Sequence, residues 1–145
     1  VMMRRTLIAA VLLGLALELF VQPGAALADD CKAEAPGVLV LKAENGEGIV
    51  AVLPSLLPLK AGQQFELVLT LCGAAAGGEI SAVDAMMPKH GRGMNYRAQV
   101  FAGEQPGLFR AEGLLLHMAG EWRLTADARR DGQRVRYTAA VMVSP

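Results

Sequence analysis

The sequence predicts an all-β fold, a β-sandwich of about seven strands. Three observations predict it. Beyond residue 28, several windows alternate apolar and polar side chains, and none shows a sustained apolar period of 3.6 residues. Gly, Asn, Asp and Pro interrupt these windows at nearly regular intervals, as the turns between the short strands of a sandwich do. The only tryptophan, Trp122, is the expected centre of the core.

Each expected strand is a short alternating or apolar run that ends at turn residues. The runs cover residues 38–42, 49–53, 63–72, 79–85, 95–102, 108–116, 121–128 and 135–143. Asn45-Gly46-Glu47-Gly48 separates the first two runs, and Pro54 ends the second. Small residues at 73–78 form a loop, and residues 86–94 form another.

The clearest strands are the last two, which we expect to form a hairpin around residues 129–132. Trp122, Leu124 and Ala126 alternate with polar positions on the first strand. On the second strand every second residue is apolar: Val135, Tyr137, Ala139, Val141 and Val143. Side chains two apart lie on one face of a strand, so both sets are expected to face the core.

The N-terminal segment carries much of the apolar excess that gives the chain a mean hydropathy of +0.35. Arg4 and Arg5 precede an apolar run over residues 7–21, and residues 26–28 read Ala-Leu-Ala. This order is typical of a secretory signal peptide, and the run is short for a membrane span of ~20 residues. We expect residues 1–28 to be the signal peptide and residues 29–145 to be one periplasmic or secreted domain that is not embedded in a membrane. An uncleaved segment would instead act as an N-terminal anchor.

Charge and motif content exclude several classes of function. The chain has 14 basic and 14 acidic side chains, so it lacks the basic excess that nucleic-acid binding requires. It contains no Gly-x-Ser-x-Gly segment, no glycine-rich phosphate loop and no His-Glu-x-x-His helix. We therefore do not expect an enzyme.

The only two cysteines are Cys31 and Cys72. An oxidising compartment favours a disulfide between them, which would tie the start of the mature chain to a central strand. The alternative is two free thiolates that bind a metal ion.

Both histidines lie in segments that are rich in methionine. Four methionines surround them, and the combined set is Met86, Met87, His90, Met94, His117 and Met118. Thioether sulfur and imidazole together suit copper, Cu(I) more than Cu(II). Thioethers do not form disulfides and so stay available outside the cytoplasm. The pattern therefore indicates an exported copper site.

Other interpretations of the same residues stay open. Methionine fills irregular gaps in a core, which would explain Met86 or Met87. His117 has the parity of Phe109, Ala111 and Leu115, which favours a histidine at the edge of the core. Three cationic side chains lie in the same region, Lys89, Arg92 and Arg97. Their positive charge disfavours a bound metal ion, and it suggests instead a site for an acidic partner or a small carboxylate.

Residues 87–96 (MPKHGRGMNY) and 113–122 (GLLLHMAGEW) resemble two segments of the YtkA-like and FixH-like exported domains. The resemblance covers about residues 65–143. It implies an immunoglobulin-like β-sandwich and a role in copper handling or respiratory-oxidase maturation. Met87, His90, Met94 and His117-Met118 are the matching positions. Arg92 stands where the second histidine of that pattern falls, and His117 would supply the missing imidazole.

The sequence therefore predicts an exported copper-binding protein, a copper chaperone or an accessory of oxidase maturation. The expected ligands are His90, Met94, His117 and Met118, with Met86 or Met87 as a further ligand. The expected partner is a periplasmic copper acceptor or an oxidase assembly protein. The alternative is a metal-free interaction module that binds an acidic group through its basic loop.

Overall fold

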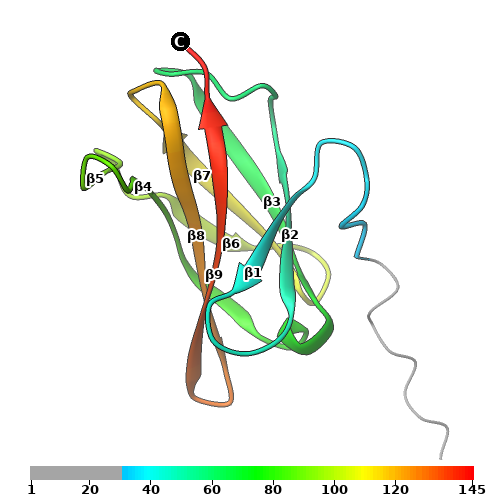
Figure 1. Cartoon of the computed structure of the whole chain (residues 1–145). Helices are drawn as coiled ribbons and strands as arrows, with labels where there is room; N and C mark the ends of the chain where they lie inside the picture. The colour runs from blue at the N-terminus through cyan, green and yellow to red at the C-terminus, as the bar shows by residue number, and fades with distance from the viewer. Residues whose placement is uncertain (1–30) are drawn as a thin grey trace, which may run out of the picture.

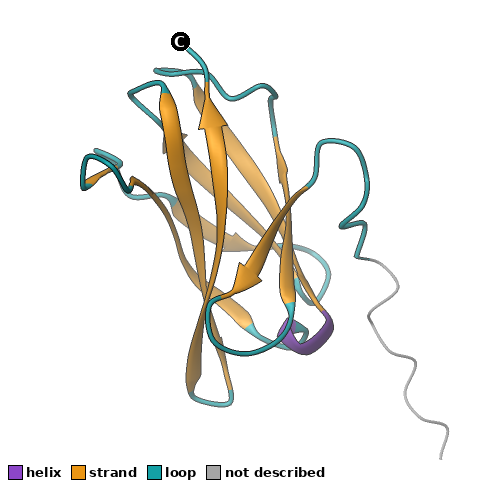
Figure 2. Ribbon diagram, in the orientation of Figure 1, coloured by secondary structure: helices purple, strands orange, loops and turns teal. Residues whose placement is uncertain are grey.

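The computed structural model describes residues 31–145, so the predicted signal peptide lies outside the described residues. Nearly every element is a strand, and there is one short 3-10 helix, η2 (Gly73–Ala75) (Figures 1 and 2). The strands are β1 (Leu39–Ala43), β2 (Ile49–Pro54), β3 (Gln64–Cys72), β4 (Glu79–Met87), β5 (Arg92–Gly93), β6 (Gln99–Ala102), β7 (Leu108–Leu115), β8 (Gly120–Arg130) and β9 (Gln133–Val143).

All nine strands are antiparallel and belong to one strongly curled sheet, in the order β5-β4-β8-β9-β1-β2-β3-β7-β6. The all-β prediction is confirmed. Hydrogen bonds join the strands into a single sheet because β1 pairs with β2 on one side and with β9 on the other. Ser144, just beyond β9, also exchanges backbone hydrogen bonds with Leu59 and Ala61. These bonds join the end of β9 directly to the segment between β2 and β3.

The core fills the concave side of the sheet. The expected alternation on β8 is confirmed, since Trp122 and Ala126 are fully buried and Leu124 is nearly so. On β9, Tyr137, Val141 and Val143 are buried, and Val135 and Ala139 pack partly buried against the same core. The two strands form the predicted hairpin, with a two-residue Asp131-Gly132 turn in which both φ angles are positive. That geometry is the one that Asp-Gly favours between twisted strands.

Two segments differ from their predicted structure. Met86 and Met87 belong to β4 rather than to a loop, and the chain then turns back at once into the two-residue strand β5. The ladder with β8, in which Met86 pairs with Arg123, extends β4 as far as Pro88 allows. In the segment 95–102, only β6 is a strand.

A β-bulge changes the parity of β7. Leu67 pairs with Ala111 but Phe65 pairs with Leu114, so β7 has one more residue than β3 between these pairs. Gly113 takes a φ of 81°, which glycine adopts without strain. Beyond the bulge, Leu114 and Leu116 therefore face the core. The prediction that Leu115 and His117 share the buried face of Phe109 and Ala111 is wrong.

The predicted disulfide between Cys31 and Cys72 is present, with the two Cα atoms 5.8 Å apart. It attaches the segment before β1 to the end of β3, and it removes both thiols from the set of metal ligands. Within residues 31–145, no helix has the length and hydropathy that a membrane crossing requires.

Candidate functional site

The two segments that contain methionine and histidine lie at the same end of the sheet. One is the β4–β5 hairpin, and the other is the loop between β7 and β8 (Figure 1). Their contact is direct, because a Cβ atom built on Gly120 would lie 3.1 Å from Cε of Met87. The thioether of Met87 therefore lies against the residue that follows His117, Met118 and Ala119 in the chain.

Met87 and Met94 share the concave face of the sheet. Met87 is only 3% exposed and belongs to the core. The backbone N–H of Met94 donates to the carbonyl of Ala85, and the Met94 side chain packs partly buried against the core. Met86 lies on the convex face, where its side chain is 39% exposed. Met87 and Met94 thus pack on the same core, and Met86 faces the opposite side of β4.

His117 lies against the indole of Trp122. The two ring centroids are 5.4 Å apart, and the rings are nearly perpendicular. Trp122 Nε1 donates a hydrogen bond of 2.9 Å to the carbonyl of Met118, which fixes the loop above the ring. Among residues 31–145, Nδ1 of His117 is the one buried side-chain nitrogen or oxygen atom that has no hydrogen-bond partner. A buried nitrogen without a partner costs free energy unless another group satisfies it.

His90 and Met118 lie at the exposed rim of this end. His90 lies in the turn between β4 and β5, where its own N–H and that of Gly91 both donate to the carbonyl of Met87. Its side chain is exposed, and the side chain of Met118 is 37% exposed. His90 and Met118 are therefore accessible to solvent at this end of the sheet, whereas Met87 lies in the interior.

The available donors restrict what this end of the sheet can bind. Within the described part of the chain, no three His, Cys, Asp or Glu side chains lie close enough together to hold a metal ion. A metal ion here would depend on thioether sulfur together with imidazole nitrogen. That donor set fits soft Cu(I) and is unsuited to hard cations such as Mg²⁺ or Ca²⁺.

The three cations of the alternative site occupy two places. Lys89 and Arg92 are exposed on the β4–β5 hairpin. Arg97, also exposed, instead lines a cleft with Glu66 and Glu112. The carboxylates beside Arg97 oppose the binding of a simple anion there.

This cleft on the convex face, here named the Tyr96 cleft, has a volume of about 470 Å³. Strands β3, β6 and β7 and the segment before β6 supply its polar residues, which are Gln64, Glu66, Tyr96, Arg97, Gln99 and Glu112. Sequence reasoning missed it because its residues come from four separate segments. The one available signal was Gly113 within a strand, since a strand glycine often marks a bulge.

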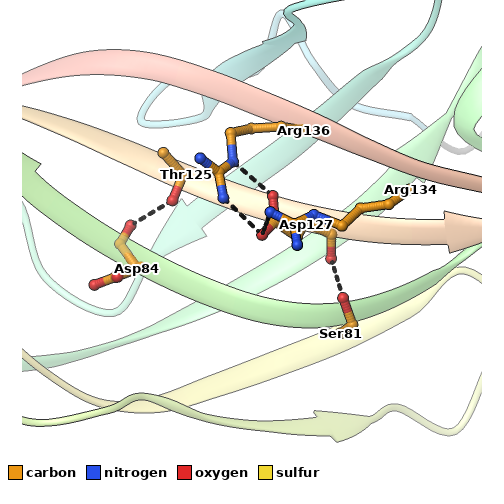
Figure 3. Close-up of polar contacts among 6 residues, drawn as sticks. All are labelled: Ser81, Asp84, Thr125, Asp127, Arg134 and Arg136. Carbon is orange, nitrogen blue, oxygen red and sulfur yellow. Dashed lines mark hydrogen bonds and ion pairs between the residues drawn. The ribbon is translucent and has the colours of Figure 1, made fainter.

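A second polar group, centred on Asp127, lies on the convex face of β4, β8 and β9 (Figure 3). Arg136 donates two hydrogen bonds to the Asp127 carboxylate, of 2.8 and 3.0 Å, and Arg134 lies 3.3 Å from it. These bonds, the Arg136 pair above all, lower the pKa of Asp127 against the opposing effect of burial. Ser81 Oγ donates to the backbone carbonyl of Asp127, which ties β4 to β8.

The chain matches no protein-family model, no curated protein and no solved structure. The resemblance to YtkA-like and FixH-like domains therefore stays a prediction that depends on two short segments. The site has to be judged by its own geometry and donor chemistry.

Proposed function

We propose that this protein is an exported copper-binding domain that carries Cu(I) as cargo and delivers it to a partner. The observation that carries the proposal is the buried Nδ1 of His117, which lacks a hydrogen-bond partner at the end of the sheet where Met87 and Met94 also lie. We also propose that the curled sheet is a variant of the immunoglobulin-like β-sandwich.

His117, Met87 and Met94 are the inner ligands in this proposal, and Met118 and His90 are the outer ones. Thioethers and a neutral imidazole bind Cu(I) without adding negative charge. The disulfide consumes both cysteines, so sulfur ligands in an oxidising compartment must come from methionine. Met86, on the opposite face of β4, is not a ligand of this ion.

Delivery depends on the difference in exposure between the inner and outer residues. Met118 and His90 are accessible, so a partner's ligands can replace them first, whereas Met87 is almost fully buried. The partner is a periplasmic copper acceptor or a respiratory-oxidase assembly protein.

The experiment is a competition titration of the protein with Cu(I) against bicinchoninate. Met94→Leu removes a sulfur atom at nearly constant volume, and His117→Phe removes both ring nitrogens. Each is expected to weaken Cu(I) binding by at least about tenfold. Met142→Leu is the matched control, because Met142 is 68% exposed on the convex face of β9, and it is expected to leave the affinity unchanged.

Two results would refute the proposal. One is a Cu(I) affinity that is micromolar or weaker. The other is an affinity that is the same in the wild type and in the Met94→Leu, His117→Phe double variant, with circular dichroism showing that both are folded. Binding of an acidic partner that weakens steeply with salt and survives copper chelation would favour the metal-free module with Lys89 and Arg92 instead.

A further inference from the structure

We propose that the Tyr96 cleft is a second binding site, which takes a neutral polyhydroxylated ligand, a saccharide, against the ring of Tyr96. The inference goes beyond copper binding and does not depend on it. It follows from the shape of the cleft, the unpaired polar groups that line it and the balance of their charges.

The shape results from the β-bulge in β7. The extra residue bends the strand, and Gly113, which lines the cleft, has no side chain to fill the space. The segment before β6 crosses close to this point, because a Cβ atom on Gly113 would lie 4.0 Å from the carbonyl oxygen of Arg97. Bulge and segment together border an open cleft of about 470 Å³, within the range of about 300 to 1,000 Å³ that is usual for small-molecule sites.

Strand pairing brings the polar side chains to one face. Gln64 and Glu66 alternate with the buried Phe65 and Leu67 on β3, so they point to the convex side. Gln99 of β6 pairs with Glu112 of β7, which places both beside them. Arg110 and Glu112 form an ion pair of 2.7 Å. Among the described residues, no hydrogen bond or ion pair engages the side chains of Gln64, Glu66, Tyr96, Arg97 and Gln99.

The charges favour a neutral ligand. Arg97 brings one positive charge, Glu66 brings one negative charge, and Arg110 already neutralises Glu112. The free groups comprise donors on Arg97 and the glutamines and acceptors on Glu66 and the same glutamines. A hydroxyl group both donates and accepts, so a ligand with several hydroxyl groups can satisfy this mixed set. An anion would instead be repelled by the Glu66 carboxylate, which has no ion-pair partner.

Tyr96 supplies the apolar contact that such a ligand needs. It is 69% exposed, the most exposed large hydrophobic side chain of the described chain. An exposed aromatic ring offers a flat apolar face and a hydroxyl group. The C–H face of a sugar ring fits that surface, while its hydroxyl groups reach the polar residues around it.

The test is an NMR titration of ¹⁵N-labelled protein with three neutral trisaccharides, maltotriose, cellotriose and tri-N-acetylchitotriose. Trigalacturonate serves as the anionic probe, and deacetylated chitotriose serves as the cationic probe. At least one neutral trisaccharide is expected to give saturable shifts at Tyr96, Gln99 and Gly113, with a Kd of about a millimolar or below. Tyr96→Ala and Gln99→Ala are expected to weaken that binding about tenfold.

Met142→Ala is the control, because Met142 is 68% exposed, nearly as much as Tyr96, and does not line the cleft. It is expected to leave the affinity within about twofold of the wild type. The proposal is overturned if no neutral trisaccharide gives saturable shifts, or if only the charged probes bind. It is also overturned if Tyr96→Ala, with an otherwise unchanged spectrum, binds as tightly as the wild type.

Discussion

Replacing Asp127 with Asn tests how far one convex-face ion cluster stabilises this sheet. Asp127 is 8% exposed and accepts two hydrogen bonds from Arg136, with Arg134 as a second cation. Asn keeps the shape but loses the charge, and its amide places N–H groups beside guanidinium groups. Arg134 also lies directly opposite Arg129 across the β8–β9 pair, so the loss leaves like charges facing each other.

The expected cost is about 2 kcal/mol of unfolding free energy at pH 7. Charge-assisted hydrogen bonds contribute about 1.5–3 kcal/mol each when buried. Here the side chains of Arg136 and Arg134 are 43% and 58% exposed, so solvent screening reduces the sum. Asp131→Asn is the control, because Asp131 lies exposed in the hairpin turn at a φ of 50°, which Asn tolerates well.

The assay is urea unfolding followed by Trp122 fluorescence at several pH values. Folding lowers the pKa of Asp127, chiefly through the hydrogen bonds from Arg136. The contribution of the Asp127 carboxylate to the unfolding free energy is therefore fully present above the unfolded pKa of about 3.9. It is lost as the pH falls through the lower folded pKa. The difference between the wild type and Asp127→Asn should therefore be constant above about pH 5 and shrink toward pH 2. A difference that is the same at pH 7 and pH 2 would show that packing, not charge, causes the loss.

Two further predictions concern stability. The Cys31→Ser, Cys72→Ser double variant should lose about 4 kcal/mol of unfolding free energy, because the disulfide closes a sequence separation of 41 residues. Urea unfolding of the wild type with and without reductant should give a similar difference, and an unchanged midpoint would contradict it. Gly48→Ala should lower the Tm far more than Gly46→Ala. Both glycines have a positive φ, but only at Gly48 would the new Cβ lie 2.5 Å from the backbone nitrogen of Ala75. Equal losses would show that φ alone governs both positions.

The sequence was sufficient to predict strands wherever alternation was long. The alternation of Trp122, Leu124 and Ala126 correctly predicted which side of β8 is buried. It failed at β7, where the bulge at Gly113 shifts the parity and places Leu114 and Leu116 in the core instead of Leu115. A single glycine in an apolar run does not reveal whether the pairing partner has the extra residue.

Strand pairing itself could not be predicted, because it depends on contacts between distant segments. Nothing in the five residues of β1 shows that they pair with β9 as well as with β2. The same limit applies to the candidate copper site. The pattern predicted a ligand set drawn from both Met and His segments. The contact of Met87 with Gly120 and the unpaired nitrogen of His117, however, depend on the β4–β8 register.

The position of the disulfide has a mechanical consequence. Only two residue pairs join β1 to β9, Lys42 with Thr138 and Ala43 with Tyr137, so β1 is the narrow bridge between the halves of the sheet. A pull applied at Cys31 would otherwise peel this strand away first. The covalent link to Cys72 instead passes the load to the end of β3, which is hydrogen-bonded to β2 and β7 along most of its length. The strand that joins the two halves of the sheet is thereby bypassed when the chain is held by its N-terminal side.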